Sequence, residues 1–233
     1  HVLISSKDYL IAQLTGECVG DVAACSTAGA MNIRNGQWDV ELCEAAGIDM
    51  TILPQLHNPQ DNIGTVTESA AQRTGFSAGT AVYAGIGDAG ATTLASGVSH
   101  PGQYNINIGT SGWIATVSPE PFTDKPGAAN LAFGVEEGFV NAVPFLNAGD
   151  VHKWVTGVFS DGDYAEAHQL IETSKPGSNG VLCLPYLVGE RFPVMNPNIR
   201  GAYVGLDPDT AKADRMRAAR EGVAFCIRQG MEG

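Results

Sequence analysis

A glycine-rich segment at residues 85–91, Gly-Ile-Gly-Asp-Ala-Gly-Ala, separates two stretches of different hydrophobic pattern. Residues 80–84 predict a short buried strand, whereas residues 91–96 predict the opening of a helix. The chain therefore passes from strand to helix through a turn in which glycine permits a tight backbone. Asp88 is the one carboxylate in that turn and can reach a substrate bound beside it. We take Asp88 as the candidate catalytic residue.

Two other interpretations of this turn remain open. The glycines also fit a dinucleotide fingerprint, but that motif needs an acidic residue about 20 positions further on to hold the ribose. The next acidic residue after Asp88 is Glu120, and Asp88 itself would repel phosphates in an anion-binding loop. Alternatively, Asp88 caps a helix that begins near Ala89, because Asp is a favoured N-cap residue. Capping and catalysis are compatible.

A second glycine-rich element, Gly109-Thr110-Ser111-Gly112, lies between alternating apolar residues and predicts the turn of a β-hairpin. Its backbone N–H groups and two hydroxyls suit phosphate oxygens. Glycine and serine also populate ordinary turns, so the element alone does not establish a phosphate site. Ser111 is not favoured as a hydrolase nucleophile, because the surrounding residues do not form Gly-x-Ser-x-Gly.

A third element is Gly-Val-Leu-Cys-Leu-Pro-Tyr-Leu-Val-Gly-Glu-Arg-Phe-Pro at residues 180–193, followed by Arg-Gly-Ala-Tyr-Val-Gly-Leu at 200–206. It resembles the carboxy-domain signature of the FGGY carbohydrate kinases. The resemblance extends in order along nearly the whole chain, and this ordered set is specific although no short piece is decisive. The matching pieces are Asp8-Tyr9-Leu10, Leu14-Thr15-Gly16, residues 21–27, Trp38, Gly47-Ile48, Leu53-Pro54, Ile63-Gly64, Gly75, Gly79-Thr80, residues 85–88 and Gly109-Thr110-Ser111.

The resemblance implies an α/β, ribonuclease-H-like fold of the sugar kinase, actin and heat-shock chaperone superfamily, with ATP and sugar between two domains. Residues 1–100 would form the C-terminal part of the first, sugar-binding domain. Residues 101–233 would form the front part of the second, ATP-binding domain. The segment 97–102, with glycine at each end and a proline, is the candidate boundary.

The resemblance also implies roles for particular residues. Asp88 would bind the sugar hydroxyl and act as general base while phosphate is transferred from ATP with Mg²⁺. Gly109, Thr110 and Ser111 would form a phosphate loop, with Thr110 as the hydroxyl contact. Gly149 and Lys153 match a further phosphate-contacting stretch, although Lys153 can equally be a solvated helix charge. No residue is expected to ligate a metal directly.

The substrate expectation is a pentulose such as xylulose, with gluconate, another ketose or glycerol as alternatives. A catalytically silent binding domain of the superfamily also remains open, although Asp88 weighs against it.

Glu190 and Arg191 are expected to form an ion pair that braces the cleft wall, or to contact substrate. His152 is expected to be a helix-surface residue, since no metal-ligand spacing surrounds it.

Two motifs typical of the family do not occur here: an Asp-x-Gly-Thr turn before His1, and a glycine-rich adenosine segment after the helix at 212–229. We therefore expect an internal piece of a longer kinase, inactive alone.

A net charge of −12 argues against a nucleic-acid surface. No apolar stretch reaches membrane-spanning length, and the cysteines form no Cys-x-x-Cys pair. We expect a cytoplasmic protein with reduced thiols that can form a homodimer.

The coarse element expectations follow from apolar periodicity, caps and turn residues. The 29 glycines are dispersed, as expected for many strand-to-helix turns. We expect helices at 6–14, 38–46, 67–74, 164–173 and 212–229, a loop at 21–31 that enters a strand, a buried strand at 181–184, and short strands between 131 and 145.

Overall fold

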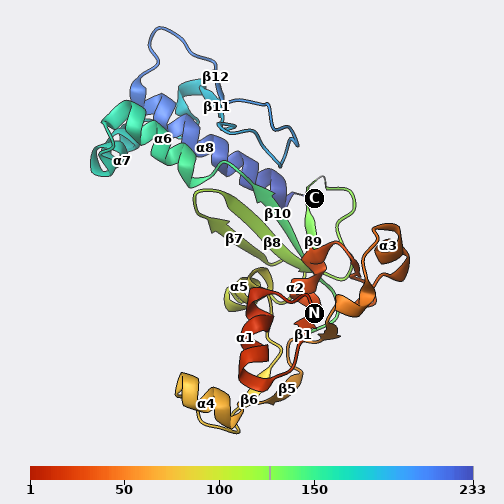
Figure 1. The fold of residues 1–233 in the computed structure, drawn as a ribbon. Coiled ribbons are helices and arrows are strands. Elements are labelled where there is room, and N and C mark those ends of the chain that lie inside the picture. The colour runs from red at the N-terminus through yellow and green to blue at the C-terminus, as the bar shows by residue number, and fades with distance from the viewer. Residues whose placement is uncertain (126, 233) are drawn as a thin grey trace. The chain divides into compact units, whose positions relative to one another are not determined.

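The computed structural model describes residues 1–125 and 127–232 (Figure 1). The chain divides into two compact units. Unit 1 comprises His1–Gln103, Thr116–Phe122 and Ala129–Asn141, and unit 2 comprises Tyr104–Ala115, Thr123–Ala128 and Ala142–Gly233. Within the described residues, no helix is long and apolar enough to cross a membrane.

Unit 1 begins with helix α1 (Ser6–Thr15), which confirms the helix expected at 6–14. The Ser5 side chain caps the helix by accepting a hydrogen bond from the Asp8 backbone N–H. The helix ends at Gly16, whose φ of 88° lies in the left-handed region that glycine adopts without strain.

The loop expected at 21–31 is wrong, because most of this segment is helical. Strand β1 (Val19–Asp21) pairs in parallel with β4 (Gln55–His57) and leads directly into α2 (Val22–Cys25). The Asp21 side chain caps α2 by accepting from the Ala24 backbone N–H at 2.9 Å. The segment continues as η1 (Ser26–Ala28), and β2 (Met31–Asn32) then pairs with β3 (Gln37–Trp38).

The expected helix at 38–46 is shorter, because Trp38 belongs to β3 and the Asp39 side chain caps the helix that follows. Helix α4 confirms the expected helix, with Thr67 as its N-cap and Gly75 as its left-handed C-cap. The other elements up to residue 95 are α3 (Val40–Ala45), η2 (Met50–Ile52), β5 (Asn62–Thr65), α4 (Glu68–Thr74), β6 (Ala81–Tyr83), antiparallel to β5, and α5 (Asp88–Ala95).

The longest sheet has the strand order β7-β8-β10-β9, and its first two strands form the expected hairpin around residues 109–111. Gly112 lies where no side chain fits, since a Cβ there would be 2.4 Å from the Phe145 ring. Phe145 is buried with Ile114 and Ala148. The strands are β7 (Tyr104–Ile108), β8 (Gly112–Ser118), β9 (Ala129–Ala132) and β10 (Phe139–Phe145).

Helices dominate the rest of unit 2, and α7 spans the expected residues, with Asp163 as its N-cap. Strand β11 begins one residue later than expected and is only half buried, because Leu182 and Leu184 are exposed while Cys183 is buried. The elements are α6 (Gly149–Ser160), α7 (Tyr164–Thr173), η3 (Ser178–Gly180), β11 (Leu182–Leu184), β12 (Ala202–Val204), antiparallel to β11, and α8 (Lys212–Met231).

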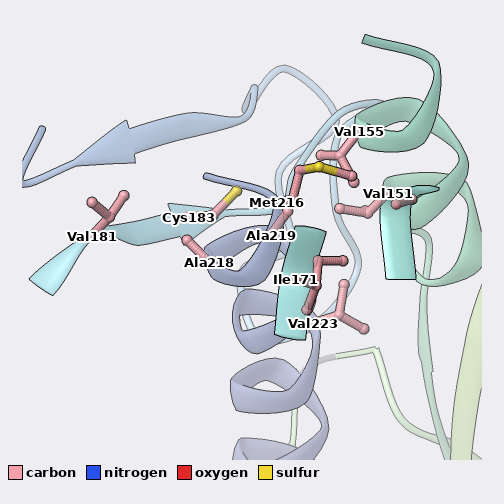
Figure 2. Close-up of a cluster of buried hydrophobic side chains, with 10 residues drawn as sticks. Val151, Val155, Ile171, Val181, Cys183, Met216, Ala218, Ala219 and Val223 are labelled. Atoms are coloured by element: carbon pink, nitrogen blue, oxygen red, sulfur yellow. The ribbon is translucent and has the colours of Figure 1, made fainter. Parts of the chain in front are cut away.

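The core of unit 2 forms where α6, α7 and α8 pack against one another and α8 packs against β11 (Figure 2). Small residues on α8 allow this close packing, since a Cβ on Gly222 would be 2.3 Å from the Cys183 carbonyl oxygen. The core therefore holds α6 and the strand of the 180–193 element as one body. Its buried members are Val151, Val155, Ala167, Ile171, Val181, Cys183, Met216, Ala218, Ala219 and Val223.

Candidate functional site

The Asp88 turn joins β6 to α5 in unit 1. Gly85 has a φ of 68°, a left-handed conformation that favours glycine. Gly87 is the N-cap of α5, and a Cβ there would lie 3.3 Å from Ala24 on α2. The helix begins at Asp88, not at Ala89. The interpretation of Asp88 as the N-cap is therefore wrong, because Asp88 already occupies the first helical position.

The Asp88 carboxylate is exposed and lies at the N-terminus of an eight-residue helix. Its Oδ1 atom accepts a hydrogen bond from the Ala89 backbone N–H at 2.8 Å. The partial positive charge of a helix N-terminus stabilises a nearby carboxylate. This hydrogen bond orients the Asp88 carboxylate, and its Oδ2 atom accepts no hydrogen bond from the other described residues.

A cavity of about 170 Å³ adjoins Asp88 within unit 1. At about 30 Å³ per water molecule, its volume suits a few waters or the hydroxymethyl end of a polyol. Of the described residues that form its wall, Asp88 alone carries a carboxylate. The lining residues come from the α1 N-terminus, α2 and η1, the Asp88 turn, β9 and β10: Ser5, Ala23, Ala24, Thr27, Gly87, Asp88, Ala89, Gly90, Leu131, Ala132 and Val140.

The hairpin turn of unit 2 packs against the start of α6. The Gly109 carbonyl accepts from the Gly149 N–H at 2.8 Å, and the Thr110 carbonyl accepts from the Ala148 and Asp150 N–H groups at 3.3 and 3.2 Å. A Cβ on Gly149 would lie 2.5 Å from the Gly109 carbonyl oxygen. Close packing against the hairpin turn therefore requires glycine at position 149. The N–H groups at the start of α6 already donate hydrogen bonds to this turn.

The hydroxyls of Thr110 and Ser111, unlike those amides, are not engaged in hydrogen bonds with the described residues. Both residues are exposed, and neither hydroxyl makes a hydrogen bond to any other residue described in the structure. The turn is closed by the Gly109 N–H, which donates to the Ser111 carbonyl at 2.9 Å. The hairpin thus presents two free hydroxyls from a fixed backbone.

Lys153 lies one helical turn after Gly149 and is exposed on α6. No ion pair involves Lys153 among the described residues, so its ammonium is available to an anion. It lines an open cavity of about 510 Å³ in unit 2. That cavity is formed by Asn147, Asp150, Lys153, Trp154, Gly157, Val158, Leu187 and Val188.

Glu190 does not form the expected ion pair with the Arg191 side chain. Its carboxylate is buried and accepts from the backbone N–H groups of Leu146 and Arg191, each at 2.7 Å, and from Asn147 Nδ2 at 2.8 Å. Two backbone N–H groups and the Asn147 amide take the place of a cation, and Arg191 is exposed. Glu190 therefore ties the 180–193 element to the end of β10.

Asn147 is a residue that the sequence analysis missed. Its side chain is buried, donates to the Gly189 carbonyl at 2.7 Å, and accepts from the Leu187 N–H at 2.8 Å. Together with Glu190 it fixes the chain immediately before Gly149. No sequence signal could reveal this pairing, because the partners lie about forty residues apart.

His152 is not a free surface residue. The Arg220 guanidinium contacts both ring nitrogens of His152, at 3.3 and 3.0 Å, and Tyr164 packs edge-on against the ring. Burial first, and then the charge of Arg220, lower the pKa of His152. The ring therefore joins α6, α7 and α8.

Among the described residues there is no group of three or more His, Cys, Asp or Glu side chains that could hold a metal ion. Asp88 alone offers a carboxylate at its cavity. Mg²⁺ is commonly bound through one or two carboxylates together with substrate phosphates and water. One carboxylate at the cavity suits Mg²⁺ held in this way.

Comparison with known proteins shows which family the chain resembles. The model of the N-terminal domain of the FGGY family of carbohydrate kinases matches residues 1–95, and the model of its C-terminal domain matches residues 104–233. The chain belongs to the FGGY family. This confirms the resemblance seen in the sequence.

Two curated relatives of this FGGY chain come from Bacillus subtilis strain 168. A gluconokinase is 31% identical over 233 residues, covering 95% of this chain and 45% of that protein. A xylulose kinase is 29% identical over 233 residues, covering 99% of this chain and 47% of that protein. The chain thus spans about half the length of the curated relatives it matches.

Solved structures show the same fold. The ligand-bound xylulose kinase from Lactobacillus acidophilus superimposes with a TM-score of 0.89 at 29% identity, over 96% of this chain and 46% of that one. The gluconate kinase from the same organism gives a TM-score of 0.88 at 28% identity, over 95% of this chain and 45% of that one. The expected α/β fold of this superfamily is therefore confirmed.

Proposed function

We propose that this FGGY protein transfers phosphate from ATP to a hydroxyl of a sugar, with a pentulose such as xylulose as the first candidate. The observation that carries the proposal is the exposed, oriented Asp88 carboxylate on the wall of a small cavity at the start of α5. Relatives named xylulose kinase support the substrate class.

Asp88 is the general base in this proposal. Its free oxygen accepts a hydrogen bond from the attacking hydroxyl and takes that proton as the new O–P bond forms and the bond to ADP breaks. A carboxylate suffices, because the hydroxyl becomes acidic only as the transition state forms. Positioning and charge stabilisation supply most of the catalysis in phosphoryl transfer.

Unit 2 would bind the nucleotide phosphates. The free hydroxyls of Thr110 and Ser111 donate to phosphate oxygens, and the Lys153 ammonium contributes a positive charge. Gly109 and Gly149 allow the turn and α6 to approach closely. Mg²⁺, when bound, neutralises phosphate charge. We propose the domain boundary at residues 97–102, with residues 1–100 serving the sugar and 101–233 serving ATP, except that Leu131, Ala132 and Val140 line the cavity of Asp88.

Gluconate is a second candidate substrate, because a gluconokinase at 31% identity and a gluconate kinase structure are among the relatives. The deciding experiment measures ADP release by the full-length protein on xylulose, gluconate, glycerol and other ketoses. The same panel is run on Asp88→Asn and on a matched control, Asp209→Asn, whose exposed side chain lies outside the proposed site.

We expect Asp88→Asn to lower kcat by about 10²–10⁴-fold, the usual contribution of general acid–base catalysis, with little change in KM for ATP. The control should match the parent. Parental turnover by Asp88→Asn on the best sugar would show that Asp88 is not the base. No turnover by the parent on any sugar would favour the silent binding domain.

A further inference from the structure

The ammonium group of Lys7 lies at the meeting point of three chain segments in unit 1. It donates to the carboxylate of the neighbouring Asp8, lies 3.0 Å from Asp21 Oδ2, and donates to the Ala84 carbonyl at 2.7 Å. These acceptors belong to α1, to the end of β1, and to the residue that follows β6 and precedes Gly85.

The two carboxylates are fully buried, whereas the Lys7 side chain is 28% exposed. Ser5 donates its hydroxyl to Asp8 at 2.7 Å, and the Ala24 N–H donates to Asp21 at 2.9 Å. Burial alone would lower the pKa of Lys7, but the hydrogen bond to Asp8 and the charge of Asp21 outweigh it and raise that pKa. The ammonium therefore remains charged, and it is the cation that compensates both acids.

The same segments form the cavity beside Asp88. Ser5, which holds Asp8, and Ala24, which is held by Asp21, both line that cavity. Gly87 lies close enough to Ala24 that a Cβ would approach it to 3.3 Å. Ala84 begins the turn that ends at Asp88. The bonds of Lys7 thus connect the α1 and α2 walls of the cavity to the turn that carries the carboxylate.

We infer that Lys7 is a positioning residue for Asp88. Its ammonium fixes the Ala84 carbonyl against α1 and β1, and this sets the path of the turn and the direction of the Asp88 carboxylate. Lys7 is absent from the cavity wall, so it acts through the turn and not on substrate. The catalytic consequence rests on the proposed role of Asp88, whereas the positioning itself does not.

The first test uses Lys7→Met, which keeps most of the aliphatic stem and removes the charge. Hydrogen exchange by mass spectrometry should show amides of residues 85–90 exchanging about tenfold faster or more, while α7 in unit 2 keeps its parental rates. Lys175→Met, at an exposed lysine on the other unit, is the matched control and should change neither region.

The second test measures turnover by the full-length protein on its best sugar. A 1 Å misplacement of a catalytic group can cost about 10²-fold, so we expect Lys7→Met to lower kcat about 10–100-fold and to leave KM for ATP unchanged. Lys7→Arg keeps the charge and should recover part of kcat. A purely structural role would instead lower the melting temperature without this split between kcat and KM.

Parental exchange at 85–90 in folded Lys7→Met would overturn the inference, whatever the activity. If Lys7→Met does not fold, Asp21→Asn decides, because its Oδ1 can still cap α2 while the charge facing Lys7 is lost. Faster exchange at 85–90 in Asp21→Asn supports the inference, and parental exchange there refutes it. A parent without kinase activity would defeat the proposed function but leave the exchange result valid.

Discussion

Replacing Asn147 by alanine tests the clamp that holds the 180–193 element to the start of α6. The side chain is buried and makes four contacts: Nδ2 donates to the Gly189 carbonyl and to Glu190, while Oδ1 accepts from the N–H groups of Leu187 and Val188. Alanine removes all four contacts and leaves the Glu190 carboxylate buried with one donor fewer.

The magnitude depends on which contacts have substitutes. The Leu187 N–H also donates to the Pro185 carbonyl at 2.9 Å, and the contact from Val188 is long at 3.3 Å, so we discount both. The bonds from Nδ2 to Gly189 and Glu190, at 2.7 and 2.8 Å, have no replacement. A neutral hydrogen bond contributes about 0.5–1.5 kcal/mol and one to a charged group about 1.5–3 kcal/mol, which gives a loss of about 2–4.5 kcal/mol.

The assay is hydrogen exchange as a function of urea, read on peptides from α6 and β11, which reports the opening free energy of unit 2. Asn198→Ala is the matched control, since its exposed side chain makes no hydrogen bond in the described part of the chain. Asn147→Asp should lose more than Asn147→Ala, because it places a second carboxylate beside Glu190. A loss below about 1 kcal/mol for Asn147→Ala, or an equal loss in the control, would refute the reasoning.

Two further predictions concern titrating groups. Burial, with added repulsion from Asp8 and Asp21, raises the pKa of the Cys25 thiol to about 12. At pH 8, iodoacetamide should therefore label the exposed Cys18 at least about 100-fold faster than Cys25, as followed by peptide mass spectrometry. Equal labelling rates would contradict the described burial of Cys25. The hydrogen bond from Ser174, followed by those from Ala211 and Asn179, lowers the pKa of Asp214 below its ordinary 3.8. The stabilisation from the Asp214 carboxylate is therefore present above pH 3.8 and is lost as the pH falls through the lowered pKa. In urea titrations, Asp214→Asn should make the unfolding free energy fall less steeply between pH 5 and pH 2. An unchanged slope would count against this prediction.

Local signals predicted the longer elements well. Helix α7 follows an Asp N-cap, and α4 lies between a Thr N-cap and a glycine C-cap, so in both cases adjacent residues specify the boundaries. The segment 21–31 was misjudged because α2 has only four residues, too few to show a helical period. The Asp21 cap is the one local signal that marks its start.

The candidate site was predictable only in part. The turns of Asp88 and Thr110 are visible in the sequence because glycines mark them. The bonds that support the segments next to these turns join distant residues: Lys7 reaches Ala84, and Asn147, just before α6, reaches Glu190. A single sequence carries no record of such pairings, because nothing distinguishes these partners from other residues of the same type until the chain folds. The roles proposed for Asp88, Gly109, Thr110, Ser111, Gly149 and Lys153 remain predictions.

Residues 129–141 pack as part of unit 1, and this affects when unit 1 can fold during synthesis on the ribosome. Ala132 belongs to the buried cluster with Val22 and Met31, its N–H donates to Ser26 at 2.9 Å, and Leu131 and Val140 complete the cavity of Asp88. Domains generally fold as units while the chain emerges, N-terminal parts first. Residues 1–103 therefore stay partly uncovered until residues 129–141 have left the exit tunnel, and nascent chains stalled before residue 129 should be digested readily by protease at α2.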